Sequence, residues 1–291
     1  MGKFSGVLIC ADCDGTLMDD KKIISKKNSE AIKYFQDEGG YFTLATGRFP
    51  WHANNYKDSI SVNAPVVSLN GVMVYDLEKE KTIRFTPMNT DEAFEVLKYL
   101  NENHVGIWEY WLNFNGLESA CYKPFDDKFE SESLKVNLES ECNAILRNHA
   151  PEEKKVFEYI SSRVPKETAK NVFVMPDDML PAVQKDLREK FGERFRFDSS
   201  WPNGLEMQDR NSSKGDAVQF LKNYLGDVNM VICIGDYEND ISMIRTADRG
   251  YAVKNAADIV KKEADVITLS DNNEDAVFEL INDLENFICG C

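Results

Sequence analysis

Short apolar runs alternate with helical periods along the first 85 residues of the chain. Three runs have the length and continuous hydrophobicity of buried strands, at residues 7–12, 41–46 and 65–69. Between the first two, Ser25 is a suitable N-cap for a helix and Gly39 is a suitable end for it. A second helix is expected over residues 50–60. Strands that alternate with helices predict right-handed crossovers and a parallel, doubly wound sheet.

The same alternation returns in the last part of the chain. We expect strands at residues 230–235, 251–253 and 266–269. We expect helices at residues 214–225 and 238–246, around Asp258 and at the C-terminus. The run 231–234 is apolar at every position, which is typical of a central parallel strand. Both ends of the chain therefore contribute to one α/β fold, a Rossmann-like doubly wound parallel sheet.

The segment between these parts has a different pattern. Aromatic strands are predicted at residues 106–114, 171–175 and 194–198, and helices at residues 91–103, 151–161 and 177–191. This mixture predicts an inserted α+β domain. We expect a core formed by residues 1–85 and 200–291, with the insert at 86–199.

Composition agrees with a folded protein of this size. The 291 residues are 43% hydrophobic and 11% aromatic, and a chain of this length has enough apolar surface for two domains. The formal charge of −16 disfavours nucleic acid and anionic membranes as partners, because both are polyanions. With no apolar run near the length of a membrane span, we expect a cytoplasmic monomer or homodimer.

Cysteine usage points to free thiols. Seven cysteines is an odd number in a chain that needs no disulfide to be stable, and this indicates a reducing compartment. Cys10 and Cys13 are spaced as C-x-x-C, but Cys10 lies inside a predicted strand, whereas a redox C-x-x-C opens a helix. We therefore favour a structural role for the C-x-x-C pair over a zinc or redox site, and a redox role for Cys289 and Cys291 stays open.

The first candidate for chemistry directly follows a predicted strand. Asp12 and Asp14 flank the end of the run 7–12, and Gly15 then allows a sharp turn. In open α/β sheets the carboxyl ends of the strands form the ligand crevice. A solvated acidic turn would explain one of these aspartates more easily than both. The pattern predicts that both carboxylates lie in an active site.

A second acidic cluster follows the strand 230–235 and contains Asp236, Asn239 and Asp240. Taken alone, it could be a helix N-cap, where acids are favoured by the helix dipole. Together with Asp12 and Asp14 at a neighbouring strand end, it forms a set of hard oxygen ligands. Such a set suits Mg²⁺, which binds carboxylates, water and substrate phosphate.

Two further positions supply groups that hold a phosphoryl group. Thr46, Gly47 and Arg48 follow the second strand, and Lys214 with Gly215 opens a predicted helix. Hydroxyl, backbone amide, guanidinium and ammonium groups are the donors that bind phosphoryl oxygens. Each motif is common by itself. Their positions at the ends of predicted parallel strands, beside the acidic clusters, support a phosphate-binding role.

As a set, these motifs resemble the haloacid dehalogenase-like hydrolases, and within them the Cof-type, subclass IIB phosphatases with a large cap domain. The resemblance covers the whole chain in motif order: Asp12-x-Asp14-Gly15-Thr16, Thr46-Gly47-Arg48, Asn70-Gly71, Lys214-Gly215 and Gly235-Asp236-x-x-Asn239-Asp240. Cys13 departs from the hydrophobic residue more usual between the two aspartates, and its thiol could be oxidised beside the site. The resemblance implies a Mg²⁺-dependent phosphatase acting on small phosphorylated metabolites such as sugar phosphates, with substrate specificity supplied by the cap.

The resemblance also implies a role for each motif residue. Asp12 is the expected nucleophile and Asp14 the general acid and base. Thr46 and Lys214 are expected to stabilise the phosphoryl oxygens. The expected metal ligands are Asp12, Asp14 through its carbonyl, Asp236, Asn239 and Asp240. The expected phosphate-side contacts are Gly47, Arg48, Asn70, Gly71 and Asn239.

Two other functions stay open from the sequence. A phosphosugar mutase needs the same nucleophile and acid, but returns the phosphoryl group to the sugar. A phospho-acceptor signalling module also combines an acidic cluster with Thr and Lys in a doubly wound sheet. Its acceptor does not follow the first strand, however, and it has no insert of this size.

Overall fold

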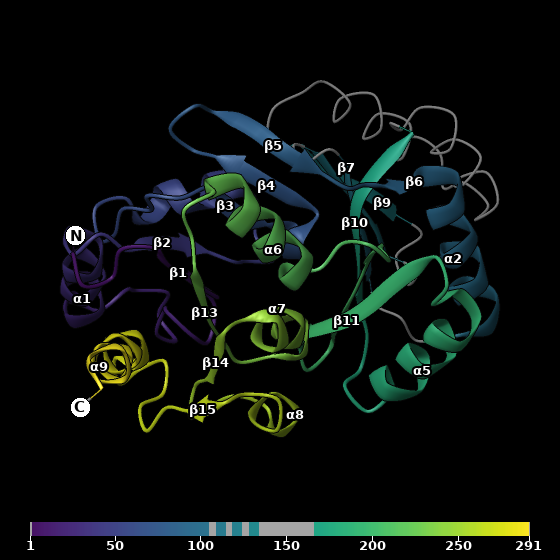
Figure 1. Cartoon of the computed structure of the whole chain (residues 1–291). Coiled ribbons are helices and arrows are strands. Elements are labelled where there is room, and N and C mark those ends of the chain that lie inside the picture. The colour runs from purple at the N-terminus through teal and green to yellow at the C-terminus, as the bar shows by residue number, and fades with distance from the viewer. Residues whose placement is uncertain (1, 105–108, 115–117, 124–127, 134–165, 291) are drawn as a thin grey trace. The chain divides into compact units, whose positions relative to one another are not determined.

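The computed structural model describes residues 2–104, 109–114, 118–123, 128–133 and 166–290 (Figure 1). The chain divides into two compact units, one made of Met1–Phe85 with Ser212–Cys291 and the other of Thr86–Asn211. The second unit thus continues past residue 199, where the sequence pattern ends the predicted insert. The reason is strand β12 (Gly204–Asp209), which pairs with the strands of the second unit.

The first unit is built on a five-stranded parallel sheet, as expected. Its strands are β1 (Val7–Ala11), β2 (Tyr41–Leu44), β13 (Met230–Gly235), β14 (Arg249–Ala252) and β15 (Val266–Ile267). Their order across the sheet is β15-β14-β13-β1-β2, so β1 lies between β13 and β2. The two distant segments of the chain therefore meet at β1 and β13.

Helices cover both faces of this sheet (Figure 1). They are α1 (Lys26–Asp37), α6 (Lys214–Leu225), α7 (Ile241–Thr246), α8 (Asp258–Lys261) and α9 (Ala276–Cys289). Side chains of α1 and α9 pack with Ile9 and Ile232 on one face, while α6 and α7 pack with Leu8 and Val231 on the other. The alternation along each strand thus gives the two apolar layers of a doubly wound fold.

Residues 65–69 differ from the sequence prediction. Strand β3 (Val66–Ser68) joins an antiparallel sheet with β4 (Met73–Asp76) and β5 (Lys81–Phe85), instead of extending the parallel sheet. A parallel bridge between Ala45 and Val67 links it to the end of β2.

Three short 3₁₀ helices complete this unit, at Pro50–Tyr56, Leu69–Gly71 and Glu238–Asp240. The first falls within the helix expected over residues 50–60. The third forms the start of the helix expected over 238–246.

The second unit holds an antiparallel sheet with helices packed on it. Its strands are β6 (Met88–Asn89), β7 (Glu109–Phe114), β8 (Glu118–Lys123), β9 (Lys128–Ser133), β10 (Glu167–Val174), β11 (Phe195–Trp201) and β12. Helices α2 (Thr90–Asn103) and α5 (Leu180–Phe191) share an apolar core with side chains such as Phe173 and Met207. The helix expected at 151–161 and the start of the strand expected at 106–114 lie outside the described residues.

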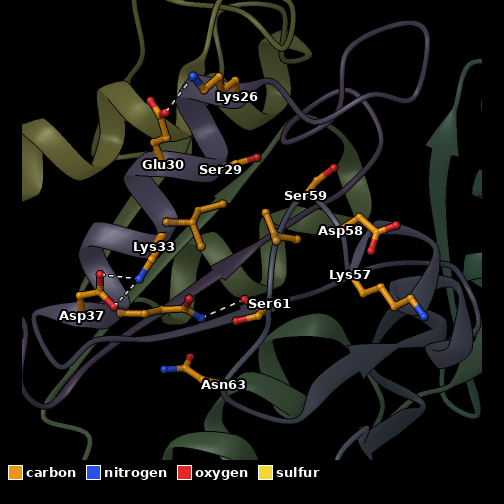
Figure 2. Close-up of a pocket in the computed structure, with 13 residues that line it drawn as sticks. Lys26, Ser29, Glu30, Lys33, Asp37, Lys57, Asp58, Ser59, Ser61 and Asn63 are labelled. Carbon is orange, nitrogen blue, oxygen red and sulfur yellow. Dashed lines mark hydrogen bonds and ion pairs between the residues drawn. The ribbon is translucent and has the colours of Figure 1, made fainter.

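A surface groove of about 550 Å³ lies between α1 and residues 57–63 (Figure 2). The ion pairs Lys26–Glu30 and Lys33–Asp37 lie along it, and Gln36 donates to the carbonyl of Ser61 across it. None of the motif residues identified from the sequence lines this groove. Within the described residues, no helix combines the length and apolar character needed to cross a membrane.

Candidate active site

The ends of three adjacent parallel strands bring the motifs together. Ala11 of β1 is in register with Ile234 of β13 and with Leu44 of β2. The amide of Asp12 donates to the carbonyl of Ile234 (3.0 Å), and the amide of Ala45 donates to the carbonyl of Ala11 (2.8 Å). The residues that follow each strand therefore meet at one edge of the sheet, as the topology predicts.

Three carboxylates and one ammonium group form the buried part of the site. One oxygen from each of Asp12, Asp236 and Asp240 lies within 4.8 Å of the others. The ammonium of Lys214 donates to Oδ1 of Asp12 (2.6 Å) and to Oδ1 of Asp240 (2.5 Å). Lys214 is fully buried, so its charge is balanced by carboxylates and not by water.

Burial controls the ionisation of this cluster. Loss of water and repulsion from Asp240 raise the pKa of Asp12 to about 7, although Lys214 opposes the rise. Burial and the neighbouring carboxylates raise the pKa of Asp236 to about 8. Burial alone would lower the pKa of Lys214, but the charges of Asp12 and Asp240 outweigh it and hold that pKa above its ordinary value.

This donor set fits a divalent cation. Three carboxylates facing one ammonium leave an excess of two negative charges when all are ionised, and a dication would balance it. Asp240 is already occupied: Oδ1 binds Lys214, and Oδ2 accepts from the amides of Asp236 (2.9 Å) and Tyr237 (3.1 Å). Its contacts therefore orient Lys214 and the loop after β13, and leave Asp12 and Asp236 as the better placed ligands.

Gly15 and Thr16 shape the space around Asp236. Gly15 has a φ of +79°, and a Cβ built there would lie 2.5 Å from Oδ2 of Asp236. Only glycine avoids both the conformational strain and this contact. The hydroxyl of Thr16 donates to Oδ1 of Asp236 (3.2 Å) and holds the carboxylate in place.

Asp14 is bound by two cations. Arg48 makes a bidentate contact, from Nε to Oδ2 (2.6 Å) and from Nη2 to Oδ1 (2.7 Å). Lys22 adds an ion pair from Nζ to Oδ1 (2.6 Å). Burial would raise the pKa of Asp14, but the hydrogen bonds from Arg48 and Lys22 outweigh it and hold that pKa below its usual range. In the described arrangement Asp14 is an ionised carboxylate.

The loops after β2 and β3 are tied to each other. The hydroxyl of Thr46 accepts from the amide of Arg48 (3.1 Å), and the carbonyl of Thr46 accepts from the amide of Asn70 (3.0 Å). Gly47 lies between them, half-buried. Asn70 has a φ of +56° and its Oδ1 accepts from Nδ2 of Asn239 (3.2 Å). These contacts join three of the motifs.

Gly71 approaches the start of α6. Its φ is +94°, and a Cβ built there would lie 2.0 Å from the carbonyl oxygen of Ser213. Ser213 caps α6 by accepting from the amide of Asp216 (3.0 Å), and Lys214 is the first residue of that helix. This close approach gives Gly71 a packing role that positions Lys214.

Sequence reasoning missed two side chains of this site. Lys22 belongs to a charged turn and carries no motif that would distinguish it from Lys21. Thr16 is visible in the sequence only as part of a motif, without its contact to Asp236. Cys13 is buried, and burial raises the pKa of its thiol well above the ordinary value, so it stays protonated. Cys10 and Cys233 are buried free thiols as well, and Cys291 lies outside the described residues.

A family model for haloacid dehalogenase-like hydrolases matches residues 9–281 of this sequence. The chain belongs to this family. The match spans nearly the whole sequence and includes every motif described above, so the resemblance seen in the motifs is confirmed.

Known relatives agree with this assignment. The chain is 26% identical over 283 residues to the pyridoxal phosphate phosphatase YbhA of Escherichia coli, covering 94% of this chain and 97% of that one. The crystal structure of a haloacid dehalogenase-like hydrolase from Bacteroides thetaiotaomicron is 26% identical, with a TM-score of 0.67 over 97% of this chain and 99% of that one.

A haloacid dehalogenase superfamily subclass IIB sugar phosphatase shares the fold with a TM-score of 0.68 at 16% identity, over 95% of this chain and 98% of that one. At this identity the likeness shows a shared fold. The expected enzyme class, a phosphatase of this family, agrees with the names of the relatives.

Proposed function

We propose that this protein is a Mg²⁺-dependent phosphatase that hydrolyses small phosphomonoesters through an aspartyl-phosphate on Asp12. The observation that carries the proposal is the contact of Lys214 with both Asp12 and Asp240, next to Asp236, in a buried space at the strand ends. A carboxylate held in this way at the edge of a parallel sheet is suited to nucleophilic attack. Asp14, at the same edge, is suited to proton transfer.

In the first half-reaction Asp12 is the nucleophile. A carboxylate oxygen of Asp12 attacks phosphorus, the bond from phosphorus to the ester oxygen breaks, and the leaving oxygen takes a proton from Asp14. Lys214 fixes the orientation of the attacking carboxylate through its contact with Oδ1. The products of this step are the free alcohol and phospho-Asp12.

In the second half-reaction Asp14 is the base. It accepts a proton from a water molecule as the water oxygen attacks phosphorus, and the bond from phosphorus to Asp12 breaks. Inorganic phosphate leaves, and both carboxyl groups return to their starting forms. The low pKa of Asp14 in the substrate-free site means that it must gain its proton for the first half-reaction as substrate binds.

Arg48 connects substrate binding with Asp14. In the described site Nε and Nη2 of the guanidinium bind Asp14, and Nη1 donates to the hydroxyl of Tyr56 (3.4 Å). A phosphoryl group is a second anion with the geometry to bind the same guanidinium, and we expect it to draw Arg48 away from Asp14. We expect Thr46, the amide of Gly47 and Asn70 to donate to the same phosphoryl group. Thr46 is hydrogen-bonded to the amide of Arg48, and Asn239 is held against Asn70.

Asp12 and Asp236 are the residues proposed to hold Mg²⁺, with the carbonyl of Asp14 and with Asp240 and Asn239 completing or orienting the shell. When bound, Mg²⁺ supplies positive charge that screens the phosphoryl oxygens and the acidic cluster.

The test is a phosphate-release screen with and without Mg²⁺. The panel contains sugar phosphates, nucleotides, flavin mononucleotide and pyridoxal phosphate, the last because a relative is named for it. We expect release that needs Mg²⁺ and that is abolished by Asp12→Asn. Asp37→Asn, the same substitution on an exposed part of α1, is the matched control and should keep full activity.

Two outcomes would contradict the proposal. Near-normal turnover by D12N would show that Asp12 is not the nucleophile. Conversion of a hexose 1-phosphate into the 6-phosphate, without inorganic phosphate, would make the protein a mutase.

A further inference from the structure

Lys22 occupies a position that the proposed chemistry does not explain. Its ammonium lies 2.6 Å from Oδ1 of Asp14, yet Arg48 already binds both oxygens of that carboxylate. One carboxylate is thus paired with two cations, in a protein whose formal charge is −16.

The backbone around Lys22 is arranged to hold this position. Lys22 has a φ of +63°, in the left-handed region that lysine rarely adopts. Asp19 stabilises the turn: its Oδ1 accepts from the amides of Lys21 (2.9 Å) and Ile23 (2.8 Å), and its carbonyl accepts from the amide of Lys22 (2.9 Å).

The turn gains little from hydrophobic burial, because the side chains of both Lys22 and Ile23 are more than half exposed. The left-handed residue closes a tight turn, in which the amide of Asp19 donates to the carbonyl of Ile23 (3.0 Å). The same turn places the ammonium group of Lys22 beside Asp14.

We propose that Lys22 is a specificity-determining residue that binds an anionic group on the leaving group of the substrate. The inference rests on the proposed function, in which Asp14 protonates the leaving oxygen. That role places the carboxyl of Asp14 against the leaving group, and Lys22 lies beside that carboxyl. The substrate class it selects is phosphomonoesters of alcohols that carry a second acidic group near the ester oxygen, such as phosphorylated hydroxy acids.

The experiment uses three phosphomonoesters of similar size that differ in the charge of the leaving group. Phosphoglycolate carries a carboxylate, ethyl phosphate carries no charge, and phosphoethanolamine carries an ammonium. kcat/KM is measured for each with the full-length enzyme in Mg²⁺. An ester that turns over slowly is tested instead as a competitive inhibitor of the best substrate of the screen. Its inhibition constant is then compared between the variants in place of kcat/KM.

Four proteins are compared. Lys22→Asn removes the charge and suits the left-handed backbone. Lys22→Arg keeps the charge. Lys21→Asn is the matched control, because Lys21 is the exposed neighbour and makes no side-chain ion pair with any described residue. The wild-type enzyme is the reference.

We expect K22N to lower the preference for phosphoglycolate over ethyl phosphate about fivefold, as for the loss of one partly exposed ion pair. The preference for phosphoethanolamine should rise, K22R should restore the wild-type order, and K21N should change nothing. An equal loss for all three esters, or no loss, would overturn the inference and leave Lys22 as a support for Asp14. Failure of the proposed function looks different, since the wild-type enzyme would then release phosphate from no ester in either experiment.

Discussion

Asp12, Asp236 and Asp240 lie in one buried space with Lys214, and their charges do not balance. Burial, together with the neighbouring carboxylates, raises the pKa of Asp12 and Asp236, whereas Asp14, paired with Arg48 and Lys22, has a lowered pKa. Two carboxylates only two positions apart in the sequence thus have opposite electrostatic surroundings. In the proposed mechanism both states must change: bound metal would keep Asp12 ionised, and substrate would draw Arg48 away so that Asp14 can hold a proton.

The raised pKa values make metal binding and stability depend on pH. Asp12 and Asp236 titrate near pH 4 in an unfolded chain but near 7 and 8 in the metal-free fold, so the fold binds more protons across that window. The contribution of these two carboxyls to the stability of the metal-free protein should therefore fall as pH rises from 4 to 8. Mg²⁺ replaces those protons, so the stabilisation it gives should grow with pH.

Thermal unfolding in EDTA and in Mg²⁺, at pH 5 and at pH 8, checks this prediction. The rise in Tm caused by Mg²⁺ should be larger at pH 8, and Asp236→Asn should reduce it, whereas D37N should not. An equal rise at both pH values would show that these carboxyls do not bind the metal.

The sequence is sufficient to predict the acidic residues at this edge, because two apolar strands end in acids. It is not sufficient to predict Lys22. Only the fold brings the turn after residue 18 back to Asp14, and nothing local separates Lys22 from Lys21.

At the scale of elements, each end of helix α6 lies beside a glycine with a positive φ. The two glycines differ in how closely other atoms approach them. Gly71 packs against the residue that caps the N-terminus of α6, whereas Gly226 ends the helix, and a Cβ built at Gly226 would have nothing within 4 Å. A side chain at Gly226 would meet only the strain of a left-handed backbone, whereas a side chain at Gly71 would meet that strain and a steric clash as well. Comparing substitutions at the two glycines therefore isolates the effect of the clash. The crowded position is also the one that positions Lys214.

Gly71→Ala should destabilise the protein by more than Gly226→Ala, for which only the left-handed strain of about 1–2 kcal/mol applies. G71A should also lower kcat, because the start of α6 must move away from a Cβ that would lie 2.0 Å from a carbonyl oxygen. Urea unfolding and steady-state kinetics test both expectations. Equal loss of stability, with unchanged kcat in both variants, would contradict the role assigned to Gly71.

The sequence predicts whether a segment forms a strand or a helix more easily than it predicts which strands pair with one another. The apolar run at 65–69 is a strand, as its composition indicates, but it pairs with β4 in an antiparallel sheet. Local hydrophobicity does not encode which neighbour a strand selects. For the same reason β12 falls on the other side of the expected domain boundary, since its place follows from pairing with β10 and β11.

At the scale of the whole molecule, the two units have separate apolar cores. The core of the second unit is formed by residues of Thr86–Asn211, and those of the first unit by residues outside that range. All three carboxylates of the proposed metal site belong to the first unit. Metal binding should therefore stabilise the units unequally.

Differential scanning calorimetry should show two transitions, and Mg²⁺ should raise the midpoint of one of them while leaving the other in place. D12N should still show both transitions, since it removes a charge and leaves both cores intact. A single transition that moves as a whole would mean that the two units unfold as one cooperative body.

The central place of β1 has a consequence for how the protein is made. On the ribosome, β1 and β2 emerge early, but β13, the other neighbour of β1, follows only after the entire second unit. At usual rates of translation that delay is roughly 10 to 45 seconds. During it the nascent strand presents an apolar edge with no native neighbour, a natural target for chaperones. Asp12, the proposed nucleophile, leaves the ribosome near the beginning of synthesis, and Lys214, Asp236 and Asp240 join it near the end.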